Sequence, residues 1–251
     1  MYCVINLKKT LLWLVIVILC IGLYAGGNRI VETFKVGNRE IPIYSVERDD
    51  NKIALTFNCA WNDSDIDKII EILKENDADA TFFAVGEWAE KYPDALKKLD
   101  AAGFEIGNHS YNHAHYSKLT KQAVLADMEK SDKVIEEIIN KPINLFRAAY
   151  GEYTNDVVTA CDESGRIYIQ WQTDSLDYKA KSAEEITERV LKKVSEGDII
   201  LMHNGTEFTA EALETLLPAL KEKYTITAVS DLIYKDNYII DAAGRQHKNE
   251  G

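Results

Sequence analysis

Residues 104–113 read FEIGNHSYNH, a short apolar run followed at once by polar side chains. The run predicts a strand over Phe104–Gly107, and His109 and His113 follow it at a spacing of four residues. His-x-x-x-His can place two imidazoles on one side of a helical turn, a spacing that suits a divalent metal. A pair of surface histidines is the ordinary alternative, but a position directly after a strand favours a functional site.

Apolar runs of this kind recur along the chain and alternate with helical patterns. Ile66, Ile69, Ile70 and Leu73 fall on one face of a helix, and similar stripes occupy residues 125–138, 186–194 and 213–220. Alternation of strands and helices implies a parallel sheet with helices outside it. About seven such units in one chain favour a small barrel over an open sheet, although spacing alone does not separate the two. The expected strands are Ile53–Phe57, Ala80–Val85, Phe104–Gly107, Leu145–Arg147, Ile167–Trp171, Asp198–His203 and Thr225–Val229.

The composition is that of a globular protein. Hydrophobic residues make up 46% of the 251 residues and charged residues 28%. Asp plus Glu number 41 against 29 Lys plus Arg, so the formal net charge is −12. This acid excess argues against nucleic acid as a partner, because binding phosphates needs clustered basic side chains.

Residues 1–27 read as a targeting segment. Lys8-Lys9 precede an apolar run, Leu11–Ala25, that is shorter than the about 20 residues of a full membrane span. The alternatives are a cleaved signal peptide and an uncleaved membrane anchor, and Trp13 and Tyr24 at the two ends of the run favour the anchor slightly. Both alternatives predict that the rest of the chain is exported, either secreted or held at the membrane.

The remainder divides into a lead-in, one domain and a tail. Residues 28–50 form the lead-in, with an additional strand expected at Ile41–Val46. Residues 51–235 form a single domain, and the polar residues 236–251 are expected to fray. Beyond residue 27 the cysteines are Cys59 and Cys161, and a disulfide between them stays open as an alternative in an exported chain.

Polar side chains follow other predicted strands as well. The segments after these strands contain Asn58–Trp61, Arg147–Tyr150 and Asp174–Tyr178, and the last long apolar run ends in His203. His203 is either a core histidine with satisfied hydrogen bonds or a general acid at the mouth of the sheet. An imidazole held by a carboxylate suits the second role near neutral pH, and Asp177 is the candidate carboxylate.

Together these five segments resemble the polysaccharide deacetylase (NodB-homology) family over about residues 52–232, and they are most similar to its sporulation-linked PdaB branch. The family pattern is TFDD, H-[ST]-x-x-H, R-x-P-Y, D-x-x-D-W and L-x-H. The resemblance implies a distorted (β/α) barrel of about seven units. It also implies metal-dependent hydrolysis of N-acetyl groups, a non-peptide carbon–nitrogen bond, from amino sugars of cell-wall glycan. The matching segments are Thr56–Cys59, His109–His113, Arg147–Tyr150, Asp174–Tyr178 and Leu201–His203.

The resemblance assigns a role to each matching residue. His109 and His113 correspond to two ligands of a divalent metal, with Zn²⁺ the expected ion. His203 corresponds to the general acid that protonates the leaving amine, and Asp177 to the acid that orients it. The remaining assignments are the oxyanion-binding backbone N–H of Tyr150, the Arg147 partner of the catalytic base, and the substrate contacts Tyr178, Leu201 and Trp61.

The first motif departs from the family pattern. Asn58 stands where the family has its base, and Cys59 stands where it has the third metal ligand. An amide cannot take a proton from water near pH 7. Cys59 is either a zinc thiolate beside the two histidines or a small buried apolar residue. Asp63 or Asp65 could replace the missing base, although both positions are also ordinary for helix capping.

Two functions follow from this pattern. The first is a hydrolase that removes N-acetyl groups from cell-wall glycan, with a possible place in sporulation. The second is a catalytically inactive relative that binds glycan or a partner. The departures at Asn58 and Cys59 favour the second function, and the four intact motifs favour the first. A different reaction on a similar barrel is a third, weaker alternative, and the oligomeric state is left open by the sequence.

Overall fold

Strand β2 (Lys52–Cys59) lies at the centre of the main sheet and is its longest strand. The computed structural model describes residues 40–249. Within β2 every residue after Lys52 is buried, as expected for a parallel strand covered on both faces. It pairs in parallel with β3 on one side and β8 on the other, and this register places Asn58 beside His203.

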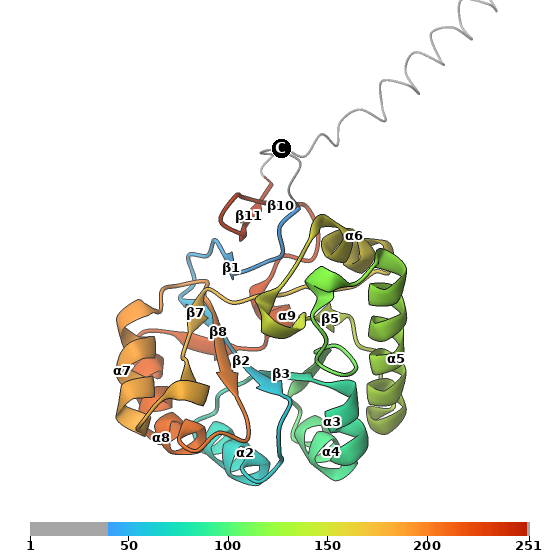
Figure 1. Ribbon diagram of the computed structural model, residues 1–251. Coiled ribbons are helices and arrows are strands. Elements are labelled where there is room, and N and C mark those ends of the chain that lie inside the picture. Colours follow the sequence, from blue (N-terminus) through green and yellow to red (C-terminus); the bar gives the residue numbers. More distant parts are fainter. Residues whose placement is uncertain (1–39, 250–251) are drawn as a thin grey trace, which may run out of the picture. The chain divides into compact units, whose positions relative to one another are not determined.

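The main sheet curls into an open barrel. Its strand order is β6-β5-β4-β3-β2-β8-β7, every pairing is parallel, and β9 pairs with the start of β2 ahead of β3. Helices form a ring outside the strands, from α7 and α8 through α2, α3 and α4 to α5 and α6 (Figure 1). The fold is therefore the predicted distorted (β/α) barrel of about seven units.

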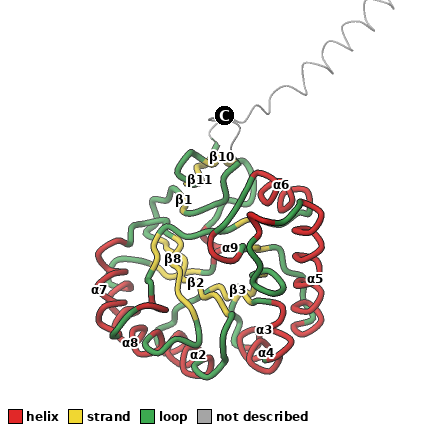
Figure 2. The backbone as a smooth tube through the Cα atoms, in the orientation of Figure 1, coloured by secondary structure: helices red, strands yellow, loops and turns green. Residues whose placement is uncertain are grey.

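The remaining elements have the following bounds. The other strands are β1 (Ser45–Val46), β3 (Thr81–Ala84), β4 (Glu105–Asn108), β5 (Leu145–Phe146), β6 (Ile167–Tyr168), β7 (Thr173–Asp174), β8 (Ile199–His203), β9 (Thr225–Thr227), β10 (Tyr238–Ile240) and β11 (Arg245–Lys248). The helices are α2 (Ile66–Glu75), α3 (Gly86–Lys91), α4 (Pro93–Ala101), α5 (Lys121–Ile139), α6 (Asn155–Glu163), α7 (Ala183–Lys193), α8 (Thr209–Lys221) and α9 (Val229–Leu232) (Figure 2).

The core fills the space between the sheet and the surrounding helices. The Phe57 and Phe82 rings stack at 4.9 Å between centroids, and the predicted apolar stripe of α2 packs on the same cluster. Each large side chain buried here stabilises the fold by about 1.5–3 kcal/mol. Helix α5 ends at Asn140 in the left-handed conformation (φ 54°), two residues before Pro142, which cannot continue a helix.

The lead-in crosses the gap between the two edges of the sheet. Ile43 forms a bridge to Ile169 beyond β6, and Ser45 forms one to Asp198 ahead of β8. The chain passes so close to Gly197 that a Cβ there would lie 1.7 Å from the Val46 carbonyl oxygen. The strand expected near residues 41–46 is thus present as β1 together with the bridge at Ile43.

The expectation that the polar tail frays is wrong for the residues described. Strands β10 and β11 form an antiparallel hairpin, and β11 pairs in parallel with β1. The buried Gln246 side chain accepts a hydrogen bond from the Tyr234 N–H at 2.8 Å and donates one to the Tyr234 carbonyl at 2.7 Å. Because a polar residue with two backbone partners holds this segment, hydropathy alone does not predict that the hairpin is ordered.

Two further expectations concern the ends of the chain and its thiols. The predicted targeting segment, residues 1–27, lies outside the described residues. No helix within residues 40–249 is both long enough and apolar enough to span a bilayer. The Cys59–Cys161 disulfide does not form: both thiols are free, and they lie in separate core clusters, with the Cys161 sulfur 3.8 Å from that of Met128.

We predict that Gln246→Ala lowers the free energy of unfolding by about 2 kcal/mol, because it leaves two buried backbone groups of Tyr234 without partners. Urea denaturation followed by circular dichroism measures the change. Lys248→Ala, on an exposed position of the same strand, is the matched control and should stay within about 0.5 kcal/mol of wild type. A change of that size for Gln246→Ala would mean that the hairpin is not held by this side chain.

Candidate active site

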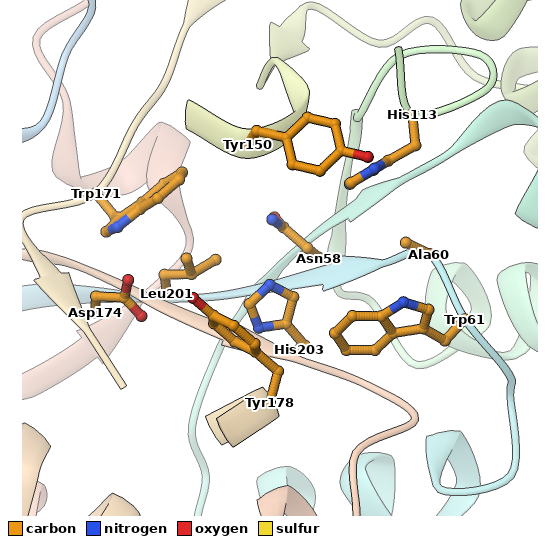
Figure 3. A pocket seen from close by; sticks show the side chains of 10 residues that line it. All are labelled: Asn58, Ala60, Trp61, His113, Tyr150, Trp171, Asp174, Tyr178, Leu201 and His203. Carbon is orange, nitrogen blue, oxygen red and sulfur yellow. The ribbon is translucent and has the colours of Figure 1, made fainter. Parts of the chain in front are cut away.

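A cavity of about 270 Å³ opens at the carboxyl ends of the central strands. Its position is the one that a parallel β/α sheet favours for ligands. Asn58 and six other residues with a predicted role reach this cavity, and three residues without a predicted role join them. The lining consists of Asn58, Ala60, Trp61, His113, Tyr150, Trp171, Asp174, Tyr178, Leu201 and His203 (Figure 3).

His203 and Asp177 form a buried hydrogen-bonded pair. The His203 Nδ1 lies 2.8 Å from Asp177 Oδ1, while Asp177 Oδ2 accepts from the His203 N–H at 2.6 Å and from the Thr209 hydroxyl at 2.7 Å. An ionised carboxylate accepts only, so Nδ1 carries the proton and Nε2 is the atom available for proton transfer. The predicted orientation of His203 by Asp177 is therefore what the geometry shows.

Aromatic rings flank the His203 imidazole. Trp61 stacks on it at 5.3 Å between centroids, and Tyr178 meets it edge-on at 5.2 Å (Figure 3). Trp61, Tyr150 and Tyr178 remain 42–57% exposed, so the mouth of the cavity presents aromatic faces to solvent. Such rings give a ligand apolar contact area with little loss of side-chain entropy.

His109 and His113 meet in a loop rather than on the predicted helical turn. The segment after β4 is irregular, and Ser110 and His113 have positive φ values of 68° and 58°. The two rings nevertheless lie 5.1 Å apart. The His109 Nδ1–H donates to the Arg147 carbonyl at 2.8 Å, and its Nε2 is buried with no hydrogen-bond partner among the described residues. Burial lowers the pKa of both histidines and so favours neutral rings with a free lone pair.

A buried polar network fixes this histidine loop. The Asn108 Oδ1 accepts from the Ser110 N–H at 2.7 Å, and the Asn108 Nδ2 donates to Asp132 at 2.6 Å. Asp132 in turn accepts from the Arg166 Nε at 2.7 Å. Asp132 could not be identified from its sequence context, because an acid within a helix normally faces solvent.

We predict that Asp132→Ala lowers the free energy of unfolding by about 3 kcal/mol, because Arg166 and Asn108 lose their buried partner. Thermal and urea unfolding measure this change. Glu129→Ala, on an exposed position of the same helix, serves as the control. Equal stability of the two variants would show that Asp132 does not support the loop.

Arg147 is fully buried beneath the cavity. Its Nη1 donates to Thr56 Oγ1 at 2.9 Å and to Asn58 Oδ1 at 3.0 Å, and its Nη2 donates to the Gln170 carbonyl at 3.1 Å. Burial lowers its pKa to about 9, which leaves it charged near neutrality. Arg147 thus faces position 58 as predicted, and the partner there is a neutral amide.

The assignment of Cys59 as a third metal ligand needs correction. Its neighbour Asn58 lines the cavity, whereas Cys59 belongs to the apolar core cluster. Adjacent residues of a strand point to opposite faces, which separates the thiol from the histidines. Burial, with a smaller contribution from Asp65, raises the pKa of the thiol well above its ordinary value. Among residues 40–249, no group of three His, Cys, Asp or Glu side chains is arranged to hold a metal.

The suggested replacement bases are not in the cavity either. Neither Asp63 nor Asp65 is among its lining residues. The two Asp65 carboxylate oxygens accept from the Gly205 N–H at 2.9 and 2.8 Å, so Asp65 holds the loop after β8. Sequence reasoning also left His115 without a role. It stacks on Tyr150 at 4.1 Å and bonds Glu152 at 2.9 Å.

We predict that Cys59 stays unreactive toward a thiol reagent between pH 7 and 9 in the native protein. Its raised pKa keeps the thiol protonated over this range, and the core excludes the reagent. Labelling at Cys59, followed by peptide mass spectrometry, measures this, with urea-unfolded protein as the positive control. Fast native labelling that added Zn²⁺ suppresses would contradict the core assignment.

Comparisons with known proteins place these features in one family. The model of the family described as polysaccharide deacetylase matches residues 45–169. A peptidoglycan-N-acetylglucosamine deacetylase of Bacillus cereus is 31% identical over 197 residues, which cover 76% of this chain and 92% of that protein. The chain belongs to the polysaccharide deacetylase family. Deacetylases of this family hydrolyse carbon–nitrogen bonds other than peptide bonds.

Other relatives show how varied the family is. The uncharacterized protein YlxY of Bacillus subtilis is 34% identical over 193 residues, covering 76% of this chain and 60% of YlxY. The chain also spans 64% of the length of a second B. cereus peptidoglycan-N-acetylglucosamine deacetylase. A solved structure from Bacillus anthracis, described as a CE4 family pseudoenzyme, superposes with a TM-score of 0.75 and 31% identity over 82% of this chain and 72% of that one.

A mutant of that pseudoenzyme is described as having restored enzymatic activity. It superposes with a TM-score of 0.74 and 33% identity over 76% of this chain and 70% of that one. Deacetylases of the polysaccharide deacetylase family are generally metal-dependent. Here the fit to a metal is incomplete, because His109 and His113 supply two imidazoles whereas catalytic zinc sites use three protein ligands. The predicted Zn²⁺ therefore stays a prediction.

Proposed function

We propose that this cavity binds the N-acetylated amino sugar of cell-wall glycan and that the chain retains only the proton-donating half of N-deacetylation. The observation that carries the proposal is the contrast between two neighbouring residues. His203 keeps its carboxylate partner Asp177, whereas Asn58 meets Arg147 with an amide oxygen. The proton-donating half of the reaction has its residues in place, whereas position 58, next to Arg147, has no titratable group.

The shape and chemistry of the cavity suit an acetamido sugar. Leu201, Trp171 and Tyr178 offer apolar surface on which an acetyl methyl group can pack. The exposed aromatic faces at the mouth suit the flat, partly apolar surface of a sugar ring. Relatives named as peptidoglycan-N-acetylglucosamine deacetylases support cell-wall glycan as the ligand.

Hydrolysis would require a proton acceptor on one side of the cavity and a proton donor on the other. The oxygen of water forms a bond to the acetyl carbon and loses a proton, the carbon–nitrogen bond breaks, and the nitrogen gains a proton. His203 Nε2 supplies that last proton, and Asp177 stabilises the imidazolium form that precedes it. Asn58 cannot accept the proton from water, since an amide has no basic site near neutral pH. The wild-type rate is therefore limited at water activation.

A second candidate function is measurable hydrolysis by the wild-type chain. The complete His203–Asp177 pair and the unpartnered, buried Nε2 of His109 favour it. The relative described as a pseudoenzyme, with activity restored in a mutant, favours the first candidate instead. The two functions differ in the amount of acetate that the wild-type chain releases.

We predict that Asn58→Asp raises acetate release from N-acetylated glycan by at least about 100-fold, because a positioned general base contributes about 10²–10⁴ to the rate. Acetate is measured after incubation with N-acetylglucosamine oligomers and added Zn²⁺. The controls are His203→Ala in the wild-type and in the Asn58→Asp background, which should abolish the gain.

Circular dichroism and thermal unfolding confirm that each variant is folded. A folded Asn58→Asp variant that still binds the oligomer but releases no more acetate than wild type would contradict a limit at position 58. Wild-type release equal to that of Asn58→Asp and dependent on His203 would establish the second candidate.

Export and a place in sporulation belong to the same proposal. Cell-wall glycan lies outside the cytoplasm, and the basic start and apolar run of residues 1–27 would direct the chain there. Whether the segment anchors the chain decides between a membrane-held and a secreted protein. The sporulation role rests on the resemblance to the PdaB branch, and spore-wall composition in a deletion strain tests it.

A further inference from the structure

The floor of the cavity holds a buried cation without an anionic partner. The Arg147 side chain is fully buried, and no Asp or Glu within residues 40–249 lies within ion-pair distance of it. Its donors instead meet neutral oxygens of Thr56, Asn58 and Gln170. Buried charges in proteins are normally paired, since an unpaired charge in a low dielectric is costly. A negative charge placed above Arg147 would therefore be stabilised.

The orientation of Asn58 is fixed by the same contact. A guanidinium only donates hydrogen bonds, so the atom that faces Arg147 Nη1 at 3.0 Å must be the amide oxygen. The Asn58 Nδ2 then points the other way, and Asn58 lines the cavity. No described residue accepts a hydrogen bond from this Nδ2. The floor thus presents an N–H donor at the place where an aspartate would present an acceptor.

The carboxylates near the cavity do not neutralise this floor. Asp177 is committed to His203 and Thr209. Asp174 lines the cavity from the end of β7, and its Oδ1 accepts from the Leu176 N–H at 2.9 Å. Asp174 pairs with Leu201 across β7 and β8, and both side chains line the cavity (Figure 3). Neither acid meets Asn58 or Arg147.

We propose that the floor of this cavity is a carboxylate-binding site. One carboxylate oxygen accepts from Asn58 Nδ2–H, the charge compensates Arg147 beneath it, and the carbon skeleton packs on Leu201 and Tyr178. The ligand class is a small carboxylate, either free or carried by an acidic amino sugar. This inference deepens the proposed function and rests on it only in using the same cavity.

Replacing the Asn58 amide with an acid reverses the preference for a carboxylate over a neutral acetamido group. An aspartate at position 58 would pair with Arg147 and repel a second carboxylate at short range. The neutral acetamido group would then be favoured over acetate. Asn58 is therefore a specificity-determining residue, with a donor that selects for anions where an acceptor selects against them.

The test compares acetate with acetamide, which have nearly the same shape and differ in charge. Binding to chelator-treated protein is followed by the fluorescence of Trp61 and Trp171, both in the lining, and by calorimetry. We expect wild type to bind acetate at least about tenfold more tightly than acetamide, and Asn58→Asp to lose this preference or reverse it. Gln122→Glu makes the same amide-to-acid change on an exposed position of α5 and should leave the ratio unchanged.

The wild-type ratio alone keeps the inference testable where the variant folds poorly. Equal affinity of wild type for acetate and acetamide, or an acetate affinity unchanged in a folded Asn58→Asp variant, would overturn it. N-acetylmuramic acid and N-acetylglucosamine then distinguish the sources. Tighter binding of the former assigns the carboxylate to a sugar, and equal binding alongside the acetate preference assigns it to a free acid. A switched ratio without any gain in acetate release would leave this inference standing while the proposed function fails.

Discussion

The site depends on how the fully buried Arg147 satisfies its hydrogen bonds within the protein. Its guanidinium joins β2, through Thr56 and Asn58, to the carbonyls after β6, while its own carbonyl accepts from His109. One buried side chain therefore ties three strand ends together beneath the cavity. Phe83 packs against the guanidinium at 4.1 Å from the ring centroid and completes its enclosure. Because Arg147 is enclosed in this way and contacts Asn58, a substitution at residue 58 directly changes the charge and hydrogen bonding at the floor of the cavity.

The neutral partner of Arg147 divides the site into unequal halves. On the side of β8, His203 and Asp177 form the pair that a proton donor needs. On the side of β2, Asn58 offers an N–H to the cavity, and Cys59 is in the core. The histidine loop follows β4, which is separated from β2 by β3, and it is held by Asn108 and by the Asp132–Arg166 pair. The cavity keeps an apolar and aromatic lining, whereas position 58 provides no group that draws a proton from water.

Much of the fold and most of the cavity could be predicted from the sequence, for definable reasons. All seven predicted strands occur, because buried parallel strands are continuous apolar runs and their polar successors meet at one edge. Strand β7, at Thr173–Asp174, and the C-terminal hairpin escaped prediction because hydrogen bonds rather than apolar burial hold them. The face of the sheet to which the Cys59 side chain points could not be predicted from the spacing of residues in the sequence. It depends on strand β2 continuing through that residue and so turning its thiol to the core.

The central claim is that Arg147 is a buried charge left unpaired by Asn58, and a double-mutant cycle on stability tests it most directly. The variants are Asn58→Asp, Arg147→Gln and their combination, with free energies of unfolding measured in urea at pH 7. We predict that Asn58→Asp is stabilising in the presence of Arg147 and destabilising in its absence, with a coupling of at least about 1 kcal/mol. A coupling near zero would contradict the claim, because it would show that Arg147 gains nothing from an anion at position 58.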